Sequence, residues 1–274
     1  NELNVPIGLI DNSKGGSPTE TWIDRKTMEF DPIFVDMLCD WTNNDMIQKW
    51  CRDRAIFNNS NSENPLQRHP YEPAYLYETL IDPLFDFPIK GAIWYQGESN
   101  AQNVELHERL FLHLVKSWRK AWGEDFPFYY VQLSSFFNTV WPRFRDSQRR
   151  LMAKIPFSGM AVSSDVGDSL DIHPYRKKQV GERLALWALA KNYDRNAEFS
   201  GPLFTSVKFI NNKAIVEFAH SKRLKSSDDH AIRTFEIAVE DKVYRSGNAT
   251  IVDDKIEVFS EEVKEPKYVR YGWQ

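Results

Sequence analysis

The chain has 274 residues, of which 42% are hydrophobic and 27% charged, a composition typical of a folded globular protein rather than a disordered one. Its 35 lysines and arginines against 39 aspartates and glutamates give a net charge of −4, which argues against a nucleic-acid-binding surface. The sequence contains no run of about 18 apolar residues, so we expect no membrane-spanning segment.

The first part of the chain alternates apolar stretches with polar loops. A short apolar run at Val5–Ile10 predicts a buried strand that enters a loop. The spacing of apolar residues over Asp31–Ala55 predicts a helical region. Asn58–Pro73 is a polar loop of unusual length, and such loops often have a function. Tyr75–Leu84 is then expected to form a short helix, and Ile89–Tyr95 a second buried strand.

The clearest element is an amphipathic helix over Val104–Trp122, whose apolar side chains share one face and which Gly123 ends. After it we expect, in turn, a strand, a helix, a strand and a helix, at Phe126–Leu133, Arg143–Ile155, Gly159–Ser163 and Lys177–Tyr193. This alternation of strands and helices predicts an α/β fold with a parallel sheet that helices cover on both faces.

The pattern changes after Gly201 and Pro202. Short alternating runs separated by turns predict a β-rich appendage. Its expected strands are Val207–Ile210, Ala214–Phe218, Phe235–Val239, Thr250–Val252 and Ile256–Phe259. We therefore expect an α/β core over residues 1–203 and a β-rich C-terminal domain over residues 204–274.

Two glycines, Gly15 and Gly16, follow the first predicted strand. Paired glycines at the carboxyl end of a strand let backbone N–H groups face a ligand, whereas the alternative is an ordinary glycine turn. The loop matches neither G-x-G-x-x-G nor G-x-x-x-x-G-K, so a nucleotide site has no support and we expect no cofactor.

The loop that begins at Gln96 follows a strand and precedes a helix, and it allows two interpretations. Gly97 to Ala101 has the start of a nucleophile elbow with Ser99 as the nucleophile, although the closing glycine is missing. Alternatively, the Gln96 amide donates to an oxyanion, because strand ends in open α/β sheets surround the ligand crevice.

The loop Asp165–Pro174 is acidic and contains His173. A carboxylate beside an imidazole fixes the tautomer and stabilises the imidazolium, as general-base catalysis requires. Asp171 precedes His173 by two residues, a separation that permits contact; a chance pairing on the surface is the alternative.

The other histidines and the cysteines indicate no metal site. His107 and His113 lie on different faces of their predicted helix, which makes them unsuited to bind one ion together. Cys39 and Cys51 are expected to be buried thiols, with a single disulfide as the alternative in an oxidising compartment. The remaining histidines are expected to be solvated: His69, His220 and His230.

Several runs resemble, in the same order along the chain, the sialate O-acetylesterases of the SGNH hydrolase superfamily. The most specific is Trp-Tyr-Gln-Gly-Glu-Ser-Asn at residues 94–100. The other runs are Leu3–Ile10, the loop from Gly15 to Trp22, Asp125–Tyr129, Asp171–Pro174 with Val180–Ala185, and Val269–Trp273. The resemblance implies a flavodoxin-like sheet of the SGNH type and removal of O-acetyl groups from sialic acid or a related sugar by serine-type acyl transfer. It also implies a secreted or periplasmic location.

The resemblance further implies a role for each loop. The Gly16 backbone N–H and the Gln96 side chain would donate to the oxyanion. His173 would be the general base, oriented by Asp171 or by Asp168. Ser99 would then belong to a loop on the oxyanion side and would not be the nucleophile.

In the family, the nucleophile is a serine in a Gly-Gln-Ser-Asn block upstream of the Val-Pro-Ile-Gly segment, and this sequence does not contain that block. We therefore expect an esterase core that is incomplete at its N-terminus, with an upstream segment supplying the serine and an O-acetylated sugar as the substrate. The chain by itself is expected to release little or no acetate. The alternatives are a hydrolase that uses Ser99 and a non-catalytic carbohydrate-binding protein that uses aromatic residues around the glycine loop.

Overall fold

The structure is a computed structural model, in which residues 2–64 and 66–273 are described. The chain divides into two compact units. The first contains the residues up to Leu133 together with Ser147–Gly159, and the second contains Ser134–Asp146 and the residues from Met160 onward. The expected division after residue 203 stays a prediction.

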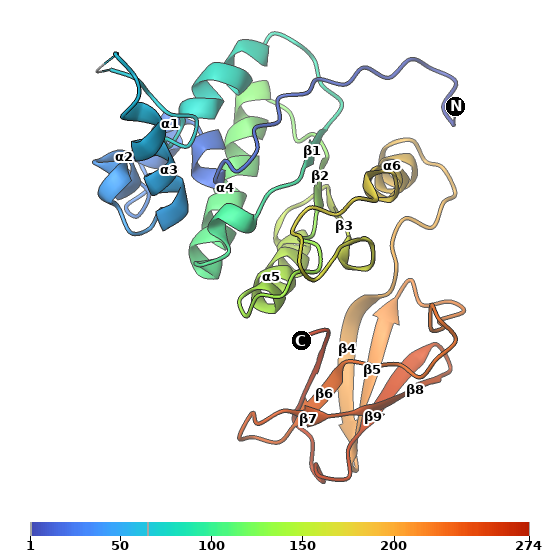
Figure 1. Ribbon diagram of the computed structural model, residues 1–274. Coiled ribbons are helices and arrows are strands. Elements are labelled where there is room, and N and C mark those ends of the chain that lie inside the picture. The colour runs from blue at the N-terminus through green and yellow to red at the C-terminus, as the bar shows by residue number, and fades with distance from the viewer. Residues whose placement is uncertain (1, 65, 274) are drawn as a thin grey trace. The chain divides into compact units, whose positions relative to one another are not determined.

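A three-stranded sheet has the order β1–β2–β3, formed by Ala92–Trp94, Phe128–Val131 and Ser158–Ala161 (Figure 1). Strands β1 and β2 are parallel, with Ala92 opposite Phe128. All four residues of β2 are buried, as is typical of a parallel strand that is covered on both faces. The predicted α/β class with a parallel sheet is therefore confirmed.

Helix α4 spans Val104–Trp122, with the bounds that the sequence predicts. The Asn103 side chain caps its first turn by accepting from the Leu106 N–H, and Gly123 ends it in the left-handed conformation at φ 65°. Its apolar face packs on the sheet, where Phe111 lies 5.1 Å from the Tyr130 ring. The core of the first unit therefore sits between α4 and strands β1 and β2.

The region predicted to be helical over Asp31–Ala55 contains short helical elements separated by irregular backbone. Asp40 adopts a left-handed φ of 44°, which interrupts the helix. The Asp31 carboxylate accepts from the Ile33 N–H and the Phe34 N–H, a local pattern that competes with helical pairing. The helices of this region are α2 (Val35–Leu38) and α3 (Lys49–Asn59), with a 3₁₀ turn at Trp41–Asn43. A 3₁₀ turn at Thr19–Trp22 and helix α1 (Arg25–Glu29) precede it.

The strand predicted at Val5–Ile10 is wrong, because this run has no regular secondary structure and pairs with no described strand. Its apolar side chains are exposed, Leu9 by 84% and Ile7 by 61%. An apolar run becomes a strand only where a neighbouring strand satisfies its N–H and C=O groups, and no described strand does so here.

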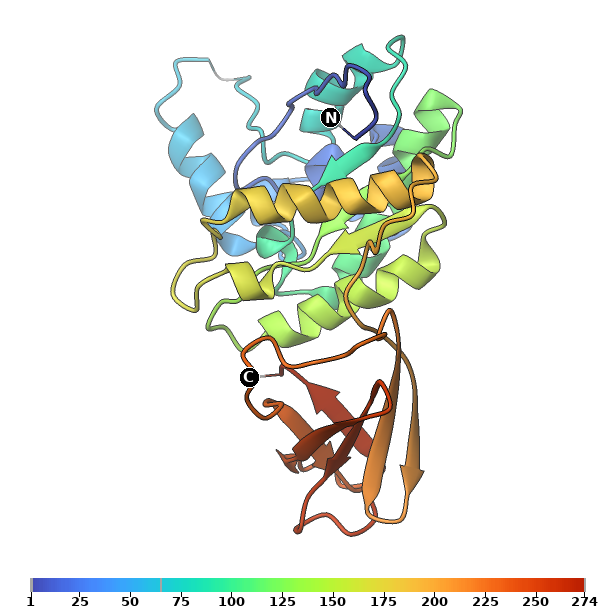
Figure 2. The ribbon, with the colours of Figure 1, turned by 90° about the vertical axis from the view of Figure 1, so that its right-hand side faces the viewer.

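The segment after the polar loop forms a π-helical turn at Tyr77–Ile81 and a 3₁₀ turn at Asp82–Leu84, close to the predicted short helix. Helix α5 spans Trp141–Lys154, and α6 is one continuous helix over Lys177–Asn192 (Figure 2). The Trp187 indole of α6 donates to the Met160 carbonyl of β3 at 3.1 Å, which ties α6 to that strand.

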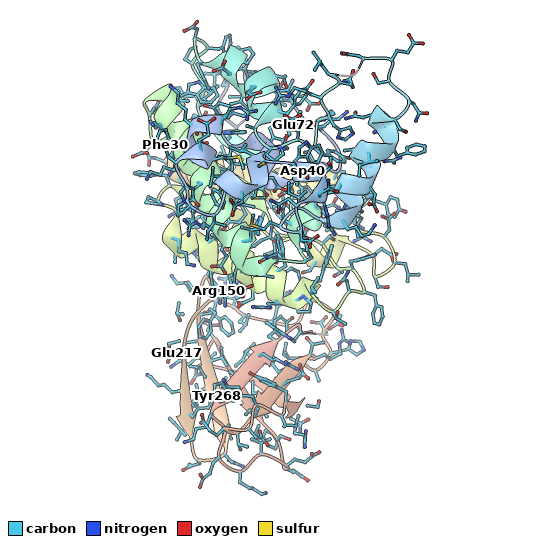
Figure 3. The ribbon with its side chains drawn as sticks, turned by 90° about the vertical axis from the view of Figure 1, so that its left-hand side faces the viewer. Phe30, Asp40, Glu72, Arg150, Glu217 and Tyr268 are labelled. Carbon is cyan, nitrogen blue, oxygen red and sulfur yellow. The ribbon has the colours of Figure 1, made fainter. Side chains whose placement is uncertain are left out.

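The β-rich region contains two antiparallel sheets, with the orders β4–β5–β9–β8 and β10–β6–β7. Their shared core includes Ala214, Phe235, Ile237 and Val258, whereas Glu217 of β5 and Tyr268 of β10 are less buried (Figure 3). The predicted strands are confirmed, and sequence reasoning missed β7. The bounds are Leu203–Ile210, Lys213–Ala219, Phe235–Ala238, Arg245–Ser246, Asn248–Val252, Lys255–Phe259 and Tyr268–Tyr271.

Candidate active site

The glycine turn at Gly15 and Gly16 is held in one conformation. The Lys14 carbonyl accepts from the Ser17 hydroxyl at 2.7 Å, and Gly16 has a φ of +73°. A Cβ at Gly16 would lie 2.5 Å from the Tyr71 hydroxyl oxygen and 2.7 Å from Cη2 of Trp50. Only glycine therefore fits this position without strain or displacement of an aromatic ring.

Hydrogen bonds bring the glycine turn and the Gln96 loop together within the first unit. The Ser99 hydroxyl donates to the Gly16 carbonyl at 2.9 Å. The Asn100 side-chain oxygen accepts from the Thr19 N–H at 2.9 Å. Segments about eighty residues apart in sequence therefore form one buried polar network.

The Gln96 amide has a defined orientation in this network. Its Oε1 accepts from the Thr19 hydroxyl at 2.7 Å, and its Nε2 donates to Asn100 at 2.6 Å. Nε2 has a second hydrogen, for which no described residue provides an acceptor. The Gly16 N–H likewise has no acceptor among the described residues. This arrangement leaves two donors that can receive a negatively charged oxygen.

Glu20 is fully buried beneath this network. Its Oε2 accepts from the Asn100 amide at 2.8 Å, while its Oε1 has no hydrogen-bond partner among the described residues. Burial raises the pKa of Glu20 to about 7, although the hydrogen bond from Asn100 opposes the rise. The carboxyl group is therefore neutral below that pH.

Ser99 is poorly placed to act as a nucleophile. It is 2% exposed, and its hydroxyl is already engaged with the Gly16 carbonyl. The neighbouring thiol of Cys51 is buried, and this burial together with the charge of Glu20 raises its pKa to about 12. Cys39 and Cys51 are both free, and Cys39 is exposed, which corrects the expectation that both thiols are buried.

The second unit contains the predicted histidine and its acidic partner. His173 Nδ1 lies 3.0 Å from Asp171 Oδ1, and the Tyr175 hydroxyl donates to Asp171 Oδ2 at 2.8 Å. The His173 backbone N–H and the Tyr175 hydroxyl hold the pKa of Asp171 below its ordinary value. Asp168 accepts from the Leu170 N–H instead, so Asp171 is the carboxylate in contact with the imidazole.

Side chains of the second unit anchor the loop that presents His173. Arg183 of α6 forms a two-pronged ion pair with Asp165, with both nitrogen–oxygen distances at 2.6 Å. The Ser169 carbonyl accepts from the Phe137 N–H at 2.7 Å. The His173 side chain is 75% exposed, so a reacting group can reach the imidazole.

The structure thus joins Gly16 with Gln96 in one unit and Asp171 with His173 in the other. The convergence of the two pairs on a single crevice stays a prediction, and so do the catalytic roles of these four residues.

Sequence reasoning missed the structural roles of Thr19, Glu20, Asn100 and His69. The expectation that His69 is solvated is wrong, because it is 6% exposed and its Nδ1 accepts from the Tyr71 N–H at 3.1 Å. His220 is half-buried against Glu198, so of these three histidines His230 alone is exposed, as predicted. A polar residue in a loop gives no local sign that it is buried. The one sequence signal for the roles of Glu20 and Asn100 was that they lie next to the glycine and glutamine motifs.

Within residues 2–64 and 66–273, no group of three or more His, Cys, Asp or Glu side chains is arranged to hold a metal ion. In the same residues, no helix is both long enough and apolar enough to cross a membrane.

Comparison with known proteins identifies the family. The sequence profile of a carbohydrate esterase family, the sialic acid-specific acetylesterases, matches residues 47–190. The chain belongs to this family. The matched region includes the Gln96 loop, whose motif is the most specific, and the His173 loop.

Individual relatives of the chain are also acetylesterases. It is 30% identical to the mouse (Mus musculus) sialate O-acetylesterase over 86% of this chain and 48% of the relative. Identity with the human (Homo sapiens) sialate O-acetylesterase is 28%, over 81% of this chain and 43% of the relative. The crystal structure of a carbohydrate acetylesterase from Xanthomonas citri superposes with a TM-score of 0.79 at 31% identity, over all of this chain and 57% of that one. The chain therefore spans about half the length of the relatives that it matches.

Proposed function

We propose that this chain forms the oxyanion and general-base part of an esterase that removes O-acetyl groups from sialic acid or a related acetylated sugar. The observation that carries the proposal is the pair of donors at Gly16 and Gln96, which the buried Thr19 and Asn100 contacts orient. Ester hydrolysis develops negative charge on the carbonyl oxygen, and donors held in place before the reaction stabilise that charge.

In this mechanism, a serine hydroxyl attacks the acetyl carbonyl while His173 Nε2 accepts its proton. Asp171 holds His173 Nδ1 and stabilises the imidazolium that forms. The Gly16 N–H and the Gln96 amide receive the oxyanion of the tetrahedral intermediate. When the tetrahedral intermediate collapses, the bond between the acetyl carbon and the sugar oxygen breaks, and the imidazolium protonates that oxygen so that the sugar leaves as an alcohol. Water then hydrolyses the acetyl-serine, with His173 acting as base again.

The serine would come from a segment outside these 274 residues. Two features of the first unit support this part of the proposal. Strand β1 has a described neighbour only on its β2 side, and its Ile93 is 66% exposed. The apolar run Val5–Ile10 is exposed as well. An unpaired edge with apolar side chains is a surface that a further strand can cover.

The test is acetate release from O-acetylated N-acetylneuraminate by the 274-residue chain, alone and joined to the upstream segment of a relative. We expect release only from the joined form, and His173→Ala should lower it about 10³-fold or more. Full activity of the His173→Ala form would refute the general-base role. Covalent labelling of Ser99 by a fluorophosphonate in the 274-residue chain would instead support the hydrolase that uses Ser99.

A non-catalytic carbohydrate-binding protein is the second candidate. The observation in its favour is the aromatic pair beside the glycine turn, where the Trp50 and Tyr71 rings lie 5.6 Å apart and Trp50 is 39% exposed. Sugar binding without hydrolysis in the joined form would favour this candidate.

A further inference from the structure

A pocket of about 560 Å³ opens beside the glycine turn in the first unit. Lys14 and Gly15 of the turn form one wall, and Arg54 and Asn58 of α3 form another. The volume falls in the range of about 300–1,000 Å³ that small-molecule sites usually have. The remaining lining residues are Asn59 at the end of α3 and seven residues of the polar loop that follows: Asn61, Ser62, Gln67, Arg68, His69, Pro70 and Tyr71.

Two cations in this pocket have no acidic partner among the described residues, namely Lys14 and Arg54. The third cation, Arg68, is already neutralised. It forms ion pairs with Glu72, which is labelled in Figure 3, at 2.9 Å and with Glu78 at 2.6 Å.

The acidic residues on and near α3 are also paired with other cations. Asp53 accepts from Lys49 at 2.6 Å, and Asp45 accepts from Arg52 at 2.9 Å. Every pocket-lining side chain other than Lys14, Arg54, Arg68 and His69 is uncharged. The pocket is therefore positive and has no carboxylate of its own in its lining.

The inner wall of the pocket is rigid and neutral. His69 Nε2 lies 3.0 Å from the Asn58 amide nitrogen, and Tyr71 donates to the Gly15 carbonyl at 3.0 Å. Burial, with the nearby charges of Lys14 and Arg54, lowers the pKa of His69. The hydrogen bonds of His69 and Tyr71 thus connect the pocket wall to the turn that presents the Gly16 N–H.

We propose that this pocket binds the carboxylate of an acidic sugar, with Arg54 and Lys14 as the residues that select it. This proposal rests on the proposed esterase function, because it says which part of the esterase substrate binds beside the Gly16 N–H. A guanidinium matches a carboxylate with two parallel hydrogen bonds, and an ammonium adds a second charge. The side-chain amides of the polar loop suit the hydroxyls and the acetamido group of such a sugar. A sugar acid whose carboxylate occupies this pocket would have its ester near Gly16, because Gly15 forms part of the pocket wall.

The direct test is the binding of three ligands to the 274-residue chain, measured by calorimetry or NMR titration. N-acetylneuraminate should bind, and its affinity should fall with ionic strength because the contact is between charges. N-acetylmannosamine, which lacks the carboxylate, should bind about tenfold or more weakly, since a hydrogen bond to a charged group contributes about 1.5–3 kcal/mol. Equal affinity for the two sugars, or for N-acetylneuraminate and inorganic phosphate, would overturn the proposal.

Variants assign the selection to named residues. Arg54→Gln and Lys14→Gln should each weaken N-acetylneuraminate binding about 10- to 100-fold. The matched control is Lys49→Gln, which removes the same charge from the same helix but lies outside the pocket lining. If the control weakens binding as much as Arg54→Gln does, the effect is one of net charge and the pocket assignment fails.

The esterase assay separates this inference from the proposed function. The measured quantity is the kcat/KM of the joined form for O-acetylated N-acetylneuraminate divided by its kcat/KM for p-nitrophenyl acetate. Arg54→Gln should lower this ratio about 10- to 100-fold. Absence of any hydrolysis, with binding that still depends on Arg54, would refute the esterase and keep the pocket. Hydrolysis with an unchanged ratio and unchanged binding would refute the pocket and keep the esterase.

Discussion

Replacement of Glu20 by glutamine should make the protein more stable at alkaline pH than the wild type. Glu20 is fully buried, one of its oxygens has no partner among the described residues, and burial raises its pKa from 4.5 to about 7. Each pKa unit corresponds to about 1.4 kcal/mol, so ionising this buried group costs roughly 3 kcal/mol of folding free energy. Glutamine has nearly the same shape and cannot ionise.

The sign of the effect follows from the direction of the pKa shift. A carboxyl whose pKa is higher in the folded state contributes its full stability below about pH 4.5, and that contribution is lost as the pH rises through about 7. The wild type should therefore lose roughly 3 kcal/mol from this residue between pH 4.5 and pH 8. Glu20→Gln should not show this loss.

Urea unfolding at pH 5 and pH 8 measures the difference. The stability of Glu20→Gln relative to wild type should rise by roughly 3 kcal/mol between the two pH values. Glu29→Gln, which changes an exposed glutamate at the end of α1, is the matched control. If the difference between Glu20→Gln and wild type were the same at both pH values, the carboxyl would not be held neutral, and our view of the buried network would be wrong.

Three further substitutions test the remaining parts of the site. Gly16→Ala should destabilise the first unit by about 1–3 kcal/mol in thermal unfolding, because the new Cβ would meet Tyr71 at 2.5 Å; an unchanged melting temperature would contradict this packing. Gln96→Ala in the joined form should lower kcat about 10²- to 10³-fold, and a change confined to KM would indicate binding rather than oxyanion stabilisation. Asp171→Asn should lower kcat about 10²- to 10⁴-fold without altering the folding midpoint, and wild-type kcat would exclude Asp171 as the orienting residue.

Local signals were sufficient for the elements that carry their own start and stop residues. The helix Val104–Trp122 was predicted to the residue, because its apolar side chains repeat on one face and Gly123 ends it; the Asn103 cap became visible only in the structure. The strands of the β-rich region were found through their alternating pattern, whereas β7 is too short, at two residues, for an alternating pattern to be recognised.

Local signals failed where a partner far along the chain decides the outcome. Val5–Ile10 has the composition of a buried strand, yet no described strand pairs with it. Apolar periodicity reports which side chains are suited to burial, and it does not report which surface is available to bury them.

The α/β class, the β-rich C-terminal region and the loops that contain Gly16, Gln96 and His173 can be read from the amino-acid order alone. These features follow from periodicity and from motifs that are contiguous in the chain. The burial of Glu20 and His69, and the placement of Arg54 and Lys14 in one pocket without an acidic partner in its lining, became visible only in the folded chain. The reason is physical: burial and charge pairing depend on distances through space, and these distances join residues that the sequence keeps apart.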